Sequence, residues 1–319
     1  MVYLITGGAG FIGRWVVKEL LSRGNEVVIL DNLSNGQKKN LKEFEKDPNL
    51  IKFVIDDIKN QEIVEKLFSK YKFSICFHLA AQINIQESLD YPERAFDNNV
   101  KGTYHILEAA RKYNTKVVII GTCMVYDLAD ASDSISENGK IKPSSPYAGS
   151  KLAAEDLALS YYHSLKLPVV ILRPFNTYGP YQKSNMEGGV VSIFVKRKLN
   201  NEKLMIFGDG TQTRDFLYVE DCADFIVTAA ENEKCVGEII NAGTGKDISI
   251  NELAKLIMGS EDNIEHIKHH HPQSEIMKLV CDNSKAKKQI SWEPKTSLEE
   301  GISKLESWMK KIYDRKTSN

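Results

Sequence analysis

The sequence predicts an α/β protein with a doubly wound parallel sheet and a smaller C-terminal domain interleaved with it. Three observations support this fold class. Short β-branched runs alternate with amphipathic helical stretches through the first half of the 319-residue chain, as in repeated strand–helix–strand units. The runs are continuously apolar, which is typical of parallel strands that helices cover on both faces. After about Pro174 the alternation stops, and a stretch rich in glycine, asparagine and charged residues begins.

Each expected element follows from its own residue pattern. β-branched and aliphatic runs predict strands at residues 2–6, 26–30, 51–55, 75–77, 117–120, 169–172 and 238–241. Apolar residues at helical spacing predict helices at residues 11–23, 62–69, 92–113, 147–164, 190–199, 250–258 and 298–311. Ser297, with Glu300 three residues later, matches the N-cap and carboxylate of a capping box, so the last helix is expected to begin there.

Two interleaved domains are expected. Residues 1–175 form the sheet domain, and residues 216–242 rejoin it, because strand and helix character returns there. Residues 176–215 and 243–319 form the smaller domain. No internal repeat and no low-complexity linker separates them.

Charge balance and cysteine content exclude several classes of protein. The chain has 42 Lys and Arg against 43 Asp and Glu, and a formal charge of −1 argues against a nucleic-acid-binding protein. No stretch approaches 18 uncharged apolar residues, so no membrane span is predicted. The chain starts on a strand pattern rather than a signal peptide. Its five cysteines contain no C-x-x-C pair, which argues against disulfides and metal sites and favours a cytoplasmic protein.

A glycine-rich turn, Gly7-Gly8-Ala9-Gly10-Phe11-Ile12-Gly13, lies between the first strand and the first helix. Such glycines permit a tight turn, a close approach of backbone to a pyrophosphate, and close packing of the helix on the strand. The helix start offers unpaired N–H groups to the phosphates. Asp31 ends the second strand, where its carboxylate accepts from a ribose 2′-hydroxyl and repels a 2′-phosphate. The sequence therefore predicts a Rossmann domain that binds NAD rather than NADP.

Tyr147 and Lys151 are four residues apart at the start of a predicted helix, so they share one face. Most such pairs are solvated, but this one lies downstream of a dinucleotide site. A free tyrosine has a pKa of about 10 and is a poor base at neutral pH. A nearby ammonium and a cationic nicotinamide favour the phenolate by charge attraction. The phenolate can then take a proton from a sugar hydroxyl while the carbon gives hydride to NAD+.

Together these motifs resemble the extended short-chain dehydrogenase/reductases, and more narrowly their NAD-dependent sugar-nucleotide epimerase/dehydratase branch. The resemblance covers nearly the whole chain. It also rests on Asp31-Asn32-Leu33, Asp57-Ile58, His78-Leu79-Ala80-Ala81, Asn99-Val100-Lys101-Gly102-Thr103, Arg173-Pro174-Phe175-Asn176, Gly208-Asp209-Gly210 and Arg214-Asp215-Phe216. It implies that NAD contacts Gly7, Gly10, Phe11, Ile12, Gly13, Asp31, Asn32, Asp57, Ile58, Leu79, Ala80, Ala81, Asn99, Tyr147, Lys151 and Pro174.

The resemblance also implies a third catalytic residue, Thr122, in Gly121-Thr122-Cys123-Met124-Val125-Tyr126. Its hydroxyl is expected to bind the reacting sugar oxygen and relay the proton to Tyr147; the alternative is an ordinary satisfied hydroxyl at a strand end. In related 4,6-dehydratases the next two positions hold Asp and Glu, whereas this chain has Cys123 and Met124. A thioether takes no proton, and a thiol with a pKa of about 8.5 is a weak acid. Thr122, Tyr147 and Lys151 alone fit a 4-epimerase.

In the expected cycle, hydride leaves C4 of a UDP-sugar for tightly bound NAD, the transient 4-keto sugar turns, and hydride returns with inverted configuration. The runner-up is a dehydratase with an atypical acid/base set. A different class is a catalytically silent NAD-binding scaffold or sensor. A homodimer is implied by the resemblance of the helices near residues 92–113 and 147–164 to those of dimeric relatives.

The resemblance places the nucleotide half of the substrate on Asn176, backbone near Val190, Phe207, Arg214 and Glu275. Arg214 would bind diphosphate oxygens, Phe207 would lie on a uracil, and Glu275 would accept from the ribose. Core packing and a solvated carboxylate are the alternatives for Phe207 and Glu275. Pro272 occupies the position of a second diphosphate arginine, directly after three histidines at residues 269–271. These histidines are interpreted as a solvated loop or as substitute phosphate donors, not as a metal site.

The identity of the sugar rests on one position. Leu279 falls where related epimerases vary the bulk beside the sugar C2 group, and leucine is smaller than the tyrosine of some relatives. An N-acetyl group is therefore expected to fit. UDP-N-acetylglucosamine/UDP-N-acetylgalactosamine is the first expectation, with UDP-glucose/UDP-galactose close behind.

Overall fold

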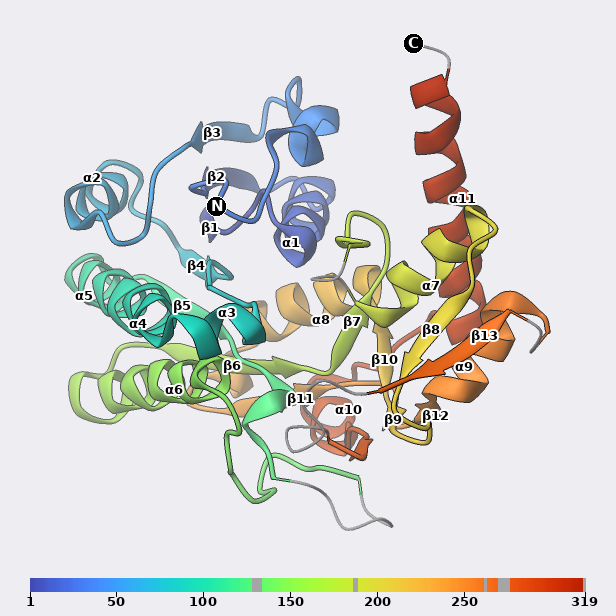
Figure 1. Cartoon of the computed structure of the whole chain (residues 1–319). Coiled ribbons are helices and arrows are strands. Elements are labelled where there is room, and N and C mark those ends of the chain that lie inside the picture. The colour runs from blue at the N-terminus through green and yellow to red at the C-terminus, as the bar shows by residue number, and fades with distance from the viewer. Residues whose placement is uncertain (128–133, 186–188, 261–262, 269–275, 318–319) are drawn as a thin grey trace.

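A seven-stranded parallel sheet forms the centre of the larger lobe (Figure 1). The computed structural model describes residues 1–127, 134–185, 189–260, 263–268 and 276–317. The sheet order is β11-β6-β5-β4-β1-β2-β3, and every neighbouring pair is parallel. The strands are β1 (Val2–Thr6), β2 (Glu26–Leu30), β3 (Leu50–Val54), β4 (Ile75–His78), β5 (Lys116–Ile120), β6 (Val169–Pro174) and β11 (Ile239–Ala242). The predicted doubly wound parallel sheet is confirmed.

Helices cover both faces of this sheet (Figure 1). One core joins the sheet to α1 and α8, and a second core joins its other face to α2, α5 and α6. These helices are α1 (Phe11–Ser22), α2 (Gln61–Tyr71), α5 (Gly102–Tyr113), α6 (Pro146–Leu165) and α8 (Val219–Glu231). Because both faces are covered, β4 and β6 are buried along their whole length, which explains why they are apolar apart from His78 and Arg173.

The predicted helix at residues 92–113 is interrupted in the structure. α4 (Pro92–Ala95) runs into a π-helical segment, η2 (Phe96–Lys101), before α5 begins. The wider turn brings Asn99 inward, where its side chain bonds both the N–H and the carbonyl of Gln82 and the hydroxyl of Ser150. A π segment adds one residue to a turn without changing the apolar pattern, so periodicity alone predicts a continuous helix.

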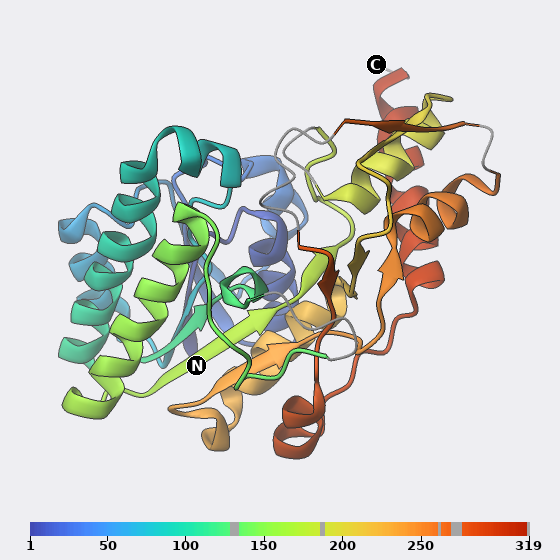
Figure 2. The same ribbon diagram turned by 60° about the horizontal axis from the view of Figure 1, so that its bottom comes forward.

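The smaller lobe packs around a third core (Figure 2). Its helices are α7 (Val190–Leu199), α9 (Ile250–Met258) and α11 (Leu298–Thr317). Its strands are β7 (Asn176–Tyr178), β8 (Leu204–Phe207), β9 (Thr213–Arg214), β10 (Phe216–Tyr218), β12 (Ile248–Ser249), β13 (Ile264–Ile267) and β14 (Lys278–Leu279). β7 pairs with β10, and β8 pairs with β13. In the described parts of the chain, no helix combines the length and apolar character needed to cross a bilayer.

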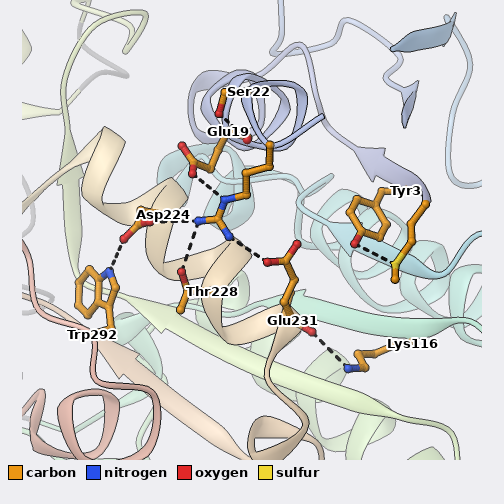
Figure 3. A network of polar contacts seen from close by, with 11 residues as sticks. Tyr3, Glu19, Ser22, Lys116, Asp224, Thr228, Glu231 and Trp292 are labelled. Atoms are coloured by element: carbon orange, nitrogen blue, oxygen red, sulfur yellow. Dashed lines mark hydrogen bonds and ion pairs between the residues drawn. The ribbon is translucent and has the colours of Figure 1, made fainter. Parts of the chain in front are cut away.

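The segment around α10 (Ser284–Ile290) differs from the predicted division of the chain. It was expected in the smaller domain, but Ala286, Ile290 and Trp292 belong to the core of the sheet domain. Trp292 packs on Phe225 of α8, with ring centroids 4.9 Å apart. Its indole N–H donates to Asp224 at 3.1 Å (Figure 3). Packing across more than sixty residues of chain decides this placement, and no local pattern predicts it.

An arginine at the end of α1 ties that helix to α8. Arg23 binds Glu19 at 2.8 Å on its own helix, and Asp224 at 3.1 Å and Glu231 at 2.9 Å on α8. These carboxylates converge on one point between the two helices (Figure 3). The network holds α1 and α8 together on the face of the sheet opposite α6. It thereby fixes α8, the helix that follows β10.

Candidate active site

The candidate active site is a cavity at the carboxyl ends of the central strands. Ligands of doubly wound sheets bind where the strand order reverses, and here that point lies between β1 and β4. The cavity brings together Gly7, Gly10, Phe11, Ile12, Gly13, Asp31, Asn32, Ile58, Leu79, Ala80, Ala81, Thr122, Tyr147, Lys151 and Pro174. All of these were candidates from sequence.

Two predicted cofactor residues do not line this cavity. Asp57 accepts a hydrogen bond from the Asn32 side chain at 2.8 Å, and its neighbour Asp56 lines the cavity instead. Asn99 is buried and serves the backbone of Gln82, while the adjacent Asn98 faces the cavity. Asp57 and Asn99 therefore hydrogen-bond to residues near the cavity instead of lining it themselves. Sequence reasoning also missed Ser34, Asn35, Gly36, Gly121, Gln182 and Thr177. The first five lie outside helices and strands, and Thr177 lies in the short strand β7.

The glycine turn is shaped by close backbone contacts. Gly7 has a φ of +73°, and a Cβ there would lie 2.7 Å from the backbone nitrogen of Ala80. At Gly13 a Cβ would lie 2.1 Å from the carbonyl oxygen of Gly7. Gly10 is the N-cap residue of α1 and has no side chain with which to cap, and the first turn of α1 holds no acidic residue. The amino end of α1 is thus suited to a phosphate.

Asp31 is held rigidly at the end of β2. Its two carboxylate oxygens accept the N–H groups of Ala9 at 2.9 Å and Leu33 at 2.8 Å. Burial raises the pKa of Asp31, and these two hydrogen bonds oppose that rise. Each oxygen retains a lone pair that can accept from a ribose hydroxyl. This geometry suits the predicted ribose-binding role.

We expect Gly13→Ala to weaken NAD binding strongly, because the added Cβ forces α1 away from the Gly7 carbonyl. The free energy of unfolding should also fall by about 2–3 kcal/mol. Calorimetric titration with NAD and urea unfolding measure the two effects. The matched control is Gly149→Ala, because a Cβ there meets no atom within 4 Å. Unchanged NAD affinity in the Gly13 variant would contradict the assigned turn.

A chain of hydrogen bonds positions Ala80 against the glycine turn. His78 bonds Thr6 at 2.8 Å and Thr103 at 2.9 Å. Thr6 accepts from the N–H of Ala80 at 3.2 Å, and Thr103 donates to the carbonyl of Asn99. These partners require Nε2–H on His78, with Nδ1 accepting from the Thr6 hydroxyl. Burial lowers the pKa of His78 to about 3, so the ring is neutral and the chain is complete at neutral pH.

The three predicted catalytic residues meet at one wall of the cavity. Thr122 follows β5, and its hydroxyl oxygen accepts the N–H of Met124 at 3.2 Å. Tyr147 lies in the first turn of α6, which Ser145 caps by accepting the N–H of Ala148. Lys151 is one turn further and is 5% exposed. The order of these elements in the fold therefore gathers Thr122, Tyr147 and Lys151, as predicted.

Burial governs the protonation of the catalytic pair. It raises the pKa of Tyr147 to about 12, although a hydrogen bond with Thr122 lowers it. It lowers the pKa of Lys151 to about 8, although Glu155 raises it. Tyr147 is therefore protonated at neutral pH unless another positive charge lies close to its oxygen. The predicted activation therefore requires the positive charge of the nicotinamide as well as that of Lys151.

The residues after Thr122 offer no carboxylate. Cys123 is 4% exposed and packs with Met124, Phe175 and Leu279 in a separate apolar cluster. Burial raises the pKa of the Cys123 thiol to about 12, so the thiol is neutral. Neither Cys123 nor Met124 lines the cavity.

The structure corrects the prediction for Leu279. This residue was expected beside the sugar, but it is 1% exposed and lines neither of the two cavities described here. It belongs to the apolar cluster that also contains Cys123. As part of β14 it pairs with Arg214 of β9, and its side chain is buried. Matching a residue to a family position by its sequence offset alone does not show which way its side chain points.

A second cavity lies beside the first. It is lined by Asn176, Val190, Phe207 and Arg214, the predicted nucleotide-binding residues that fall in the described part of the chain. Thr177 and Gln182 line both cavities and mark their junction. Glu275, Pro272 and the histidines at 269–271 lie outside the described residues. Among the residues that are described, no cluster of three His, Cys, Asp or Glu side chains is arranged to hold a metal ion.

Arg214 and Phe207 are suited to a nucleotide in different ways. One Arg214 nitrogen donates to the carbonyls of Thr213 at 2.8 Å and Ile276 at 2.6 Å, which holds the guanidinium at the cavity wall. Phe207 is 36% exposed, which favours a stacking surface over core packing. The Asn176 side chain donates to the carbonyl of Asp215 at 3.2 Å.

Asp215 anchors the segment that carries Arg214. It is fully buried, and its two oxygens accept from the N–H and hydroxyl of Thr244 and from the N–H groups of Gly245 and Cys281. These donors come from the segment after β11 and the segment after β14. One carboxylate therefore ties both segments to the residues that carry Arg214.

A Rossmann domain with an acidic residue after its second strand, joined to a Thr–Tyr–Lys set at the same cavity, defines a dinucleotide-dependent enzyme of the short-chain dehydrogenase/reductase type. Comparison with known proteins narrows this class. The family model for GDP-mannose 4,6-dehydratase matches residues 4–305. The chain belongs to this family of extended short-chain dehydrogenase/reductases, which confirms the resemblance seen in its motifs.

Solved structures and curated relatives agree with this placement. The chain is similar to the protein Pal from Bacillus thuringiensis, with 56% identity, a TM-score of 0.96, and 98% and 100% of the two chains covered. It resembles UDP-glucose 4-epimerase from Thermotoga maritima, solved with UDP-glucose, at 34% identity, a TM-score of 0.92 and the same coverage. A UDP-glucuronate 4-epimerase from Thermodesulfobacterium geofontis is 36% identical over 97% of this chain and 96% of its own.

The relatives do not share one reaction. A decarboxylase from Bacillus cytotoxicus and a 4,6-dehydratase from Dictyostelium discoideum are each 34% identical to this chain. Structural neighbours of both the epimerase and the dehydratase kinds were solved with NAD. The chain is thus an enzyme of the nucleotide-sugar epimerase, dehydratase and decarboxylase superfamily.

Proposed function

We propose that this protein is a UDP-sugar 4-epimerase that works with tightly bound NAD. The observation that carries the proposal is the composition of the catalytic wall. Thr122, Tyr147 and Lys151 lie there together, while the two positions after Thr122 hold a neutral thiol and a thioether turned into an apolar cluster. These groups suffice to oxidise and reduce one carbon, and they lack the carboxylates of an elimination.

The cofactor site fits NAD. The tight glycine turn, in which backbone packs closely against Gly7 and Gly13, and the uncapped start of α1 suit a pyrophosphate, and Asp31 suits an unmodified ribose. When bound, NAD would supply the acceptor and donor of the hydride at the sugar C4, and its oxidised nicotinamide would supply a positive charge that favours the phenolate of the buried Tyr147. The cofactor stays bound because the net redox change is zero.

The protein side chains handle the proton and the position of the sugar. Tyr147 takes the proton of the 4-hydroxyl and gives it back to the epimeric oxygen. Thr122, hydrogen-bonded to Tyr147, holds that oxygen in line. Lys151, with a pKa lowered by burial to about 8, remains mostly protonated at neutral pH and stabilises the phenolate.

The second cavity is assigned to the nucleotide. The planar guanidinium of Arg214 pairs with diphosphate oxygens, Phe207 stacks on the uracil, and Asn176 and Val190 complete the wall. The sugar must turn over between the two hydride transfers, so affinity has to be concentrated on the nucleotide. The T. maritima neighbour solved with UDP-glucose supports a UDP-sugar.

The expected preference for an N-acetylated sugar rested on Leu279 and has no support in this structure. Since this side chain is buried away from the described cavities, the UDP-glucose/UDP-galactose pair and the UDP-N-acetylglucosamine/UDP-N-acetylgalactosamine pair stand equal as substrates. The junction residues Thr177 and Gln182 are where the sugar would lie.

A 4,6-dehydratase is the second candidate, because the matching family model carries that activity in its description. It would require Cys123 to serve in an elimination, although burial raises the pKa of its thiol to about 12. A silent NAD-binding scaffold is the third. Incubating purified protein with a panel of UDP-hexoses separates them: an epimer of unchanged mass supports our proposal, loss of water supports the dehydratase, and no turnover supports the scaffold.

We also propose a cytoplasmic homodimer. The five cysteines are free and buried, which suits a reducing compartment. The neighbouring helices α5 and α6 (Figure 1) carry exposed apolar side chains at Tyr104 and Leu165, which supports a self-association surface. Sedimentation equilibrium should give twice the chain mass of 36.0 kDa, whereas a single chain mass would contradict the dimer.

A further inference from the structure

A buried ion pair lies directly behind the catalytic helix. Glu155 of α6 is one turn after Lys151 and is fully buried. Its Oε2 atom accepts from Nε of Arg173 at 3.0 Å and from Nη2 at 2.6 Å. Arg173 lies on β6 and is 2% exposed. Desolvation makes such a pair a weak source of stability compared with apolar residues of the same size, so its position suggests another role.

The second oxygen of Glu155 points at the strand end that carries Thr122. A Cβ on Gly121 would lie 2.0 Å from Oε1 of Glu155 and 3.1 Å from Cγ of Arg173. Within the described chain, this Oε1 atom and Nη1 of Arg173 have no hydrogen-bond partner. The Glu155 carboxylate therefore lies between α6, which carries Lys151, and the backbone of Gly121, the residue before Thr122.

Several titratable groups surround the pair. Those that face it or its partners are Lys151 and Asp156 of α6, Tyr126 and Cys123 of the turn after β5, and His78 of β4. Asp156 is exposed, and burial keeps Tyr126, Cys123 and His78 neutral by raising or lowering their pKa values. The Tyr126 ring covers the Arg173 guanidinium at 4.8 Å. The charged groups that act on Glu155 itself are Arg173, Lys151 and the exposed Asp156.

We propose that Glu155 is a positioning residue for the reaction: Arg173 holds its carboxylate one turn from Lys151 on the same helix, where the buried negative charge stabilises the ammonium form of Lys151. The inference rests on the proposed roles of Tyr147 and Lys151. The Glu155 carboxylate is paired with Arg173 and lies one helical turn after Lys151. Without Glu155, the buried guanidinium of Arg173 would lose its carboxylate partner, and Lys151 would lose the negative charge nearest to it on α6.

The direction of the effect follows from the charges. Burial raises the pKa of Tyr147, and the Glu155 charge adds to that rise. Burial lowers the pKa of Lys151, and the Glu155 charge opposes that fall. Removing the Glu155 charge therefore lowers both pKa values. The acid limb and the alkaline limb of the pH–rate profile should move in the same direction.

We expect Glu155→Gln to move both limbs of the kcat profile to lower pH by about one pH unit. The matched control is Asp156→Asn, which removes the same charge from the next, exposed position and should leave the limbs in place. A lower kcat with unmoved limbs would show a structural role only and would overturn the proposal, as would a shift to higher pH.

A second variant separates the charge effect of Glu155→Gln from a folding defect. In Glu155→Gln/Arg173→Met both buried charges are gone, so neither is left unpaired and folding should recover. Arg173 is not among the groups that act on the pKa of Tyr147 or Lys151, so the double variant should keep the acidward shift. A double variant with wild-type limbs would also overturn the proposal.

A measurement without substrate separates this inference from the proposed function. The ring carbons of Tyr147 can be titrated by ¹³C NMR in the NAD-bound protein and assigned by their loss in Tyr147→Phe. Glu155→Gln should lower the titration midpoint of this signal by the same interval. If the midpoint moves but no UDP-hexose is turned over, the positioning role stands and the proposed reaction fails.

Discussion

Tyr147→Phe is expected to reduce kcat by about 10³- to 10⁴-fold, the usual size of a general acid/base contribution. The variant loses only the hydroxyl that accepts and returns the substrate proton, because Tyr147 is otherwise held by packing and by its backbone N–H, which donates to Ser88 at 3.1 Å. UDP affinity should change by less than about twofold, since the nucleotide cavity does not include this residue. Steady-state kinetics and UDP calorimetry measure the two quantities.

The matched control for this variant is on the same helix. Tyr161→Phe also removes a tyrosine hydroxyl, one that donates to Glu108 of α5 at 2.6 Å. It should retain most of the activity. A Tyr147→Phe protein that keeps more than a tenth of wild-type kcat, or that loses UDP binding, would contradict the assigned role.

The second large effect concerns Asp215. Asp215→Asn should lower the free energy of unfolding by about 3–5 kcal/mol, because an amide group would turn N–H donors toward the donors of Thr244, Gly245 and Cys281. UDP affinity should fall as well, because Arg214 is the preceding residue. Urea unfolding and UDP calorimetry test both expectations.

Asp209→Asn is the control for this change. Asp209 is an exposed carboxylate of the same segment, and a single oxygen accepts both the N–H and the hydroxyl of Thr211. An asparagine keeps that oxygen, so stability should change by less than about 0.5 kcal/mol. Equal losses in the two variants would mean that the buried network around Asp215 has no special role.

Local motifs made most of the cofactor site predictable. The residues from Gly7 to Gly13 are consecutive, and their spacing alone defines the turn. Asp31 is placed by the length of one strand–helix–strand unit. Tyr147 and Lys151 share a helix face by their spacing of four. In each case the distance along the sequence determines the distance in space, so the pattern is sufficient.

Residues that depend on packing between distant segments were not predictable. Gln182 lines both cavities because its amide bonds Thr177 on one side and Ser192 of α7 on the other. Leu279 shares an offset with its relatives, but its side chain points into the interior. Glu155 and Arg173 look like ordinary helix and strand residues until the fold brings them together.

The path of one hydrogen tests the central claim most directly. A UDP-hexose with deuterium at C4 is incubated with the enzyme in ordinary water, and the product is examined by mass spectrometry and NMR. Our account predicts a product of unchanged mass that carries the deuterium at C4 with the opposite configuration. Deuterium at C6 together with the loss of water, or exchange of the C5 hydrogen with solvent, would contradict it.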